Sequence, residues 1–171
     1  MANPEHVAII KQGVAIWNQW RENNPKVKPD FTGTDLSNMD LMGANLNGSD
    51  LRSADLIEAN LTTANFNDAD LTHADLNMAN LINSNLIRAN LRSIILRGAD
   101  LRNANLSYAY LGDADLSHAH LGNTNLSYTD TKRANLSEAI FTGTILEHGD
   151  ISGCRIYGIS AWNLKTENLT Q

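Results

Sequence analysis

The side chains best suited to chemistry in this sequence are five histidines and one cysteine. Two histidines stand two residues apart, in the segment His118-Ala-His120, whereas His6, His73 and His148 stand alone. Imidazoles two apart in an extended segment share one side of the chain and could bind a metal ion. A zinc site needs three or four protein ligands, and no third ligand is identifiable near the pair. We therefore predict two solvated histidines and no metal site.

Other signals for catalysis are weak. The sequence has no CxxC pair, no glycine loop of the kind that holds phosphate and no nucleophile elbow. The one cysteine, Cys154, allows no disulfide framework and is expected to face inward as a small apolar residue. We predict that the protein is not an enzyme and uses neither a cofactor nor a small-molecule substrate.

A five-residue repeat decides where these side chains lie. From Phe31 to Ile156, 26 positions spaced by five hold Leu in 20 cases, and Phe, Ile or one Thr, Thr131, in the others. Ala stands two residues before in 15 of the 26, and Asp or Asn directly before in 20. In a locally extended chain the small residue and the Leu point to one side, and the two residues left over suit a turn. The pattern predicts a solenoid filled by one large and one small side chain per repeat.

Residues 30–156, with the motif A-[DN]-L-x-x, resemble the pentapeptide repeat family and its regular cyanobacterial members. The resemblance implies an all-β solenoid, a right-handed quadrilateral β-helix with four repeats, or 20 residues, in each coil. On that basis the 26 repeats form about six and a half coils, which stack into a rod roughly 31 Å long. We expect this solenoid to span residues 30–158.

The two flanking segments follow different patterns. Asn3 is suited to cap a helix that has Pro4 at its first position, and apolar residues recur at helical spacing as far as Trp20. We predict a single amphipathic helix over about residues 4–23, with a linker to residue 29, that covers the first coil. The repeat fails after Ile156, and residues 159–171 are expected to form a capping tail in which Trp162 covers the last coil.

Charge divides the repeat region into two halves. Residues 30–86 hold nine acids and one base, whereas residues 87–156 hold seven of each. Family members that confer quinolone resistance are acidic rods that imitate duplex DNA at a type II topoisomerase such as gyrase. A 31 Å mimic would need about 18 negative charges, but the repeats have a net charge of −8. Nucleic-acid binding is also disfavoured, because four arginines fall on all four sides of one coil: Arg88, Arg92, Arg97 and Arg102.

Residues 20 apart should stack, and this register predicts one candidate partner surface. Tyr108 and Tyr128 fall in one column with Arg88, and Ile87 adds apolar surface beside it. Trp162 is a second candidate, since whatever it leaves uncovered could mediate self-association. We predict a non-catalytic interaction or regulatory scaffold with an unidentified protein partner.

Two alternatives remain open at this stage. One is a DNA mimic that inhibits or protects gyrase, as described above. The other is a stand-alone or truncated interaction module, because RIYGISAWNL resembles the segment that precedes an effector domain in larger members of the family. We further expect a cytoplasmic protein without a membrane segment, either a monomer or a weak homodimer.

Overall fold

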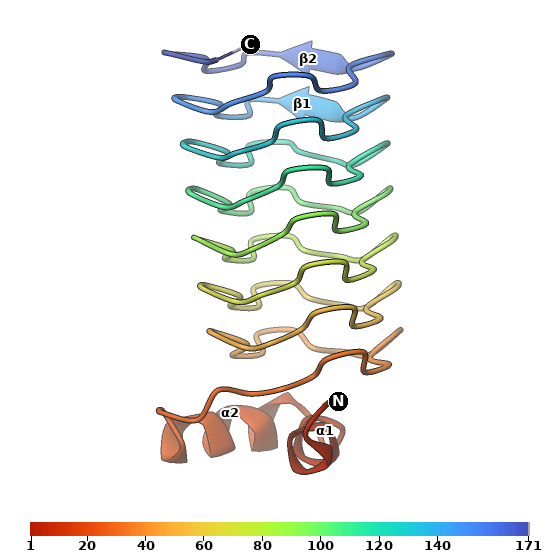
Figure 1. Ribbon diagram of the computed structural model, residues 1–171, viewed down its shortest axis with the longest axis vertical. Coiled ribbons are helices and arrows are strands. Elements are labelled where there is room, and N and C mark those ends of the chain that lie inside the picture. The colour runs from red at the N-terminus through yellow and green to blue at the C-terminus, as the bar shows by residue number, and fades with distance from the viewer. Residues whose placement is uncertain (171) are drawn as a thin grey trace.

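The computed structural model describes residues 1–170. Two helices, α1 (Pro4–Ile10) and α2 (Val14–Asn23), lie at one end of a tall column of stacked coils (Figure 1). Two strands in the blue part of the column, β1 (Ile140–Thr142) and β2 (Ser160–Trp162), pair in parallel. Among the described residues, no helix is long and apolar enough to cross a membrane.

A register of 20 residues joins every coil to the next. Isolated parallel bridges link residues 20 apart, and one column of seven such bridges leads from Asp30 to Thr170. The coils therefore continue beyond residue 158, and the predicted end there is wrong, as is the count of about six and a half coils. The sequence indicated a stop because Ala161 occupies a Leu-type position, but backbone pairing continues past it, and Leu164 and Leu169, at small-residue positions, pack against the core.

The recurring Asp or Asn closes the turn that follows it. In 18 repeats its Oδ1 accepts the backbone N–H of the residue two positions later, as Asp75 does from Asn77 (2.9 Å). A second bond spans the turn, from the N–H of the small residue to the carbonyl of the Leu-type residue, for example from Ala79 to Leu76 (3.1 Å). The second turn residue has a positive φ in every repeat from residue 33 to residue 168, as in type II turns.

The interior is one continuous apolar stack. All the Leu-type residues from Phe31 to Leu146 are buried, including Thr131, whose hydroxyl donates to the carbonyl of Asp150 (2.7 Å). Burial is lost beyond this stack, and Ile156 is 56% exposed. The end of the column at residues 151–170 therefore leaves apolar side chains open.

The N-terminal segment forms two helices where one was predicted. Gly13 has a φ of 116° and separates α1 from α2, so the single helix over residues 4–23 is wrong. The break lets both helices pack on the first coil, where Ile10 and Trp17 are fully buried. Three side chains of α2 also bond to the backbone of residues 43–47: Trp17 to the carbonyl of Asn45, Asn18 to the carbonyl of Gly43 and the N–H of Asn45, and Arg21 to the carbonyl of Asn47.

Candidate interaction surface

Three aromatic rings stack along one corner of the column. Tyr108 lies 4.8 Å from Tyr128 with an interplanar angle of 4°, and Tyr128 lies 4.6 Å from His148 with an angle of 9°. We call these three residues the aromatic column. They occupy the second turn position of successive coils, each with a φ near 60°. The tyrosines remain 51% and 48% exposed, so the stack presents ring edges and hydroxyls to solvent in a fixed arrangement.

Arg88 shares this corner but does not stack on the rings. Its guanidinium makes two bonds of 2.7 Å to the carboxylate of Asp68, one coil earlier. This pairing lowers the pKa of Asp68 and raises that of Arg88. Ile87 is half-buried, and its backbone N–H donates to Asn67 Oδ1. Of the residues predicted to form one surface, Tyr108 and Tyr128 are in contact with each other. Arg88 bonds to Asp68 instead of contacting the rings.

Trp162 lies on a different corner. It belongs to β2 opposite Thr142 and is 72% exposed, so the prediction that it folds over the last coil is wrong. The physical reason is its register: residue 162 is the first turn position after Ala161, so its side chain lies at a corner of the coil. The face that carries Asn125, Ile145 and Lys165 separates this corner from the aromatic column.

Arg92 and Tyr110 form an aromatic contact that the sequence did not predict. The guanidinium of Arg92 lies 4.7 Å from the ring centre of Tyr110, a cation–π distance. These two residues are 18 apart, so a search at intervals of 20 does not pair them. Tyr110 pairs with Asn90 on a face of the column, and Arg92 lies at the corner next to that face. A search that also compared each face residue with the adjoining corner of the previous coil would have found this contact.

The two histidines of the pair have different surroundings. His118 contacts the carboxylate of Glu138 (3.2 Å), and His120 lies in a face column between Asp100 and Ile140. Within residues 1–170 no group of three His, Cys, Asp or Glu side chains is placed to hold a metal ion. Cys154 is half-buried, its thiol bonds to the carbonyl of Thr131, and burial raises its pKa.

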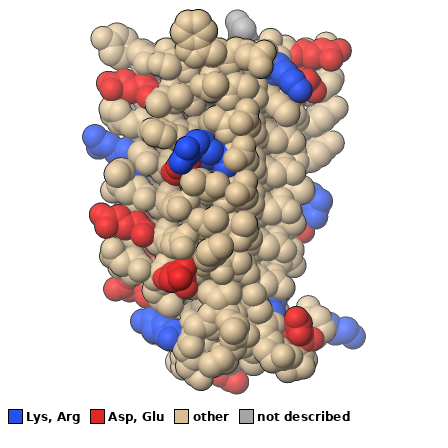
Figure 2. All heavy atoms as spheres, turned by 180° about the vertical axis from the view of Figure 1, so that it is seen from behind, with Lys and Arg blue, Asp and Glu red and all other residues tan. Residues whose placement is uncertain are grey.

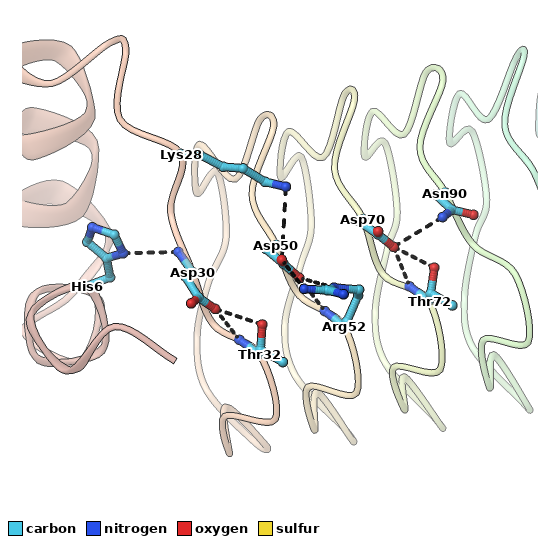
Figure 3. A network of polar contacts seen from close by, with 9 residues as sticks. All are labelled: His6, Lys28, Asp30, Thr32, Asp50, Arg52, Asp70, Thr72 and Asn90. Atoms are coloured by element: carbon cyan, nitrogen blue, oxygen red, sulfur yellow. Dashed lines mark hydrogen bonds and ion pairs between the residues drawn. The ribbon is translucent and has the colours of Figure 1, made fainter. Parts of the chain in front are cut away.

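Five of the eight basic side chains in residues 30–156 pair with a carboxylate. Arg52 and Arg102 each bond to the Asp two positions earlier, at Asp50 and Asp100, and Arg133 bonds to Asp113 one coil earlier. In Figure 2 a red and a blue group touch near the middle of the face, whereas other red groups stand apart from any blue one. The N-terminal coils differ, because there Asp30, Asp50 and Asp70 line up along one face (Figure 3).

A shallow hollow of about 330 Å³ lies at the corner beside Arg102. Gly122 provides no side chain there, and a Cβ at this position would lie 3.4 Å from Cγ of Arg102. His120, Asn123 and Ile140 contribute to the wall. The sequence pattern does not mark this hollow, since Gly at a turn position is ordinary.

Comparison with known proteins places the chain by its repeats. No curated protein matches it. Solved structures with the same type of coil include HetL, a protein involved in heterocyst differentiation regulation in Nostoc sp. strain PCC 7120, at 23% identity over 86% of this chain and 92% of that one, with a TM-score of 0.41. QnrB1, a plasmid-mediated fluoroquinolone resistance protein, is 21% identical over 81% of this chain and 86% of that one, with a TM-score of 0.41.

The protein alr5209 from Nostoc PCC 7120 is 36% identical over 63% of this chain and 79% of its own, with a TM-score of 0.38. The family model for pentapeptide repeats matches eight copies in overlapping segments from residue 30 to residue 156. The resemblance seen in the sequence is thus confirmed, and the chain belongs to the pentapeptide repeat family, whose members fold as right-handed quadrilateral β-helices.

Proposed function

We propose that the protein is a non-catalytic interaction scaffold that binds a protein partner through the aromatic column. The supporting observation is the stack of Tyr108, Tyr128 and His148, which holds exposed rings in parallel planes. Aromatic residues contribute strongly to protein interfaces. Rings that are already fixed by stacking lose little conformational entropy on binding. The adjacent pair of Arg88 and Asp68 supplies a polar rim.

The test compares capture of partners from extracts of the source organism. The Tyr108→Ala, Tyr128→Ala double variant is expected to lose a partner that the wild type retains. Tyr157→Ala is the matched control, because Tyr157 is 81% exposed on another corner and takes part in no stack among the described residues. Equal capture by all three proteins would remove the aromatic column from consideration. Circular dichroism at matched concentrations checks that the variants keep their fold.

Imitation of DNA is the competing proposal, and the acidic N-terminal coils favour it. Columns of carboxylates lie on two adjacent faces, Asp30, Asp50 and Asp70 on one and Asp35, Asp55 and Asp75 on the other. Arg52 bonds to Asp50 within this array, and residues 87–156 hold as many basic as acidic residues, seven of each. Charge of one sign thus covers less than half of the column. Failure to inhibit gyrase supercoiling, or to protect gyrase from a quinolone, at micromolar protein would eliminate this function.

Service as a module of a larger effector protein is the third alternative. It is favoured only by the likeness of residues 155–164 to a segment that follows the repeats in such proteins. The structure makes this segment part of the last coils. The cytoplasmic setting and the oligomeric state stay predictions.

A further inference from the structure

The first coil has no earlier coil to pair with. In later coils the N–H of the bridging residue donates to a carbonyl of the preceding coil, as Asp50 does to Pro29 (2.9 Å) and Asp70 to Ser49 (2.9 Å). The equivalent N–H of Asp30 donates instead to Nδ1 of His6 on α1 (3.0 Å; Figure 3). A histidine side chain thus replaces a backbone carbonyl at the edge of this face.

The imidazole of His6 is enclosed by apolar and aromatic groups. Only 4% of the residue is exposed. Its ring centre lies 5.0 Å from that of Trp20 on α2 and 6.3 Å from that of Phe31 in the first coil. The carbonyl of Asp30 accepts the N–H of Asn3 (3.0 Å), so α1 is fastened to this residue at two points. Both helices and the first coil therefore meet at this ring.

We propose that protonation of His6 releases α1 from the first coil and makes the N-terminal covering of the solenoid sensitive to acid. An imidazole nitrogen that accepts an N–H must be unprotonated. When Nδ1 gains a proton it becomes a donor directed at another donor, and the buried N–H of Asp30 loses its partner. The ring also becomes a charge among Trp20 and Phe31, which is unfavourable without a counter-ion.

In the part of the chain that the structure describes, no charged group around His6 forms an ion pair that would compensate a protonated ring. Glu5 lies on α1 and Lys11 directly after it, Arg21 and Glu22 lie on α2, and Lys28 and Asp30 lie beside or within the first coil. Arg21 is bonded to the carbonyls of Val27 and Asn47. Thr32 donates twice to the carboxylate of Asp30 and lowers its pKa, so this group stays charged over the range in which a free imidazole titrates. Within residues 1–170 His6 takes part in no ion pair.

Release of α1 is coupled to the uptake of one proton by His6, so the direction of its pH dependence is fixed. The docked state requires the neutral ring, so a lower pH favours the released state. The equilibrium constant for release therefore rises by up to tenfold for each unit by which the pH falls, in the range where the released imidazole is protonated and the docked one is not. Release of α1 would uncover its own Ile10 and, beneath the His6 ring, Phe31, both of which are now buried.

The experiment compares the wild type with His6→Gln, whose amide oxygen can accept the same N–H without titrating. Amide hydrogen exchange of α1 is measured between pH 7.5 and pH 5, with rates corrected for the intrinsic effect of pH. We expect equal protection at pH 7.5 and a loss of protection of at least tenfold at pH 5 in the wild type alone. His73, His118, His120 and His148 are common to both proteins, so the difference isolates His6.

A second measurement does not depend on any variant. The imidazole ¹⁵N shifts of the wild type at pH 7.5 should show an unprotonated Nδ1 that accepts a hydrogen bond, and acid should convert it as α1 loses protection. The same pH response in His6→Gln would overturn the proposal. A protonated Nδ1 in the docked protein at pH 7.5, or full protection of α1 in a protein with a doubly protonated ring, would do the same.

Discussion

At the scale of the residue, each position of the repeat has a separate physical duty. The large and small residues fill the interior, and the Asp or Asn between them accepts the N–H that begins the turn. The spacing of the large and small residues predicted that they fill the interior. The sequence did not predict the hydrogen bond from the turn N–H to the Asp or Asn side chain, because the spacing shows only that this side chain points away from the interior.

A charge at a Leu-type position in the middle of the column should unfold the protein. Leu101 is fully buried, so Leu101→Asp would bury a carboxylate without a partner, and we expect it to cost more than about 4 kcal/mol. Asn103→Asp is the control, because that side chain is exposed and its Oδ1 accepts from Asn123. Urea unfolding followed by circular dichroism measures both. A cooperative transition in Leu101→Asp would show that the register is wrong.

Two hydroxyl groups at small-residue positions should respond oppositely to removal. Ser84 is buried and its Oγ has no hydrogen-bond partner, whereas Oγ1 of Thr124 donates to the carbonyl of Leu101 (2.8 Å). We expect Ser84→Ala to stabilise the fold by roughly 1 kcal/mol and Thr124→Ala to destabilise it by about 1–2 kcal/mol. Their thermal midpoints decide the matter, and shifts of the same sign would contradict it. The sequence treats the two sites alike, so only the packing distinguishes them.

At the scale of the element, the turns and helices hold the column in register. The apolar spacing from Val7 to Trp17 runs through Gly13 without interruption, which is why the sequence predicted a single helix. A glycine inside a helix costs only about 1 kcal/mol, so its presence alone does not locate a break. Packing on the flat end of the first coil decides the outcome, because a change of direction at Gly13 lets α1 and α2 bury separate apolar residues, Ile10 and Trp17.

The turn at Asp35 should make stability depend on pH. The hydroxyl of Ser37, and then its N–H, donate to the Asp35 carboxylate and lower its pKa. A pKa that is lower in the folded than in the unfolded chain stabilises the fold above about pH 4 and ceases to do so as pH falls. Asp35→Asn keeps the acceptor without the titration. The wild type should therefore lose urea resistance relative to Asp35→Asn between pH 5 and pH 2, and a difference independent of pH would refute the assignment.

The contact of α2 with the first coil should depend on one amide. Asn18 accepts the N–H of Asn45 (2.8 Å) and donates to the carbonyl of Gly43 (3.0 Å), so it stands in for the missing coil. Asn18→Ala is expected to cost about 1–3 kcal/mol. Gln19→Ala is the control, since Gln19 is exposed and bonds only weakly to Glu22 (3.4 Å). Equal urea midpoints for the two variants would show that Asn18 contributes no edge pairing.

At the scale of the whole molecule, the two ends of the column differ. Both helices cover the first coil, whereas an apolar hollow of about 200 Å³ remains open at the other end. Sequence spacing anticipated the solenoid and a covered N-terminal end. It misplaced the other end because loss of large residues at Ala161 and Thr166 indicated a stop, while backbone pairing continues to Thr170. Pairing of main chains does not require the side chains to follow the motif.

The open end should produce weak self-association. Ile156 is 56% exposed and lines the hollow with Phe141 and Leu146, and removal of such a surface from water is favourable. We expect sedimentation velocity to show a reversible increase in size with concentration. Ile156→Lys should abolish it, because two ammonium groups would meet at the contact. Ile16→Lys, on the exposed side of α2, should leave it unchanged. If Ile16→Lys abolishes association instead, the helical end carries the contact, and a protein that stays monomeric at every concentration would show that the open coil is tolerated in water.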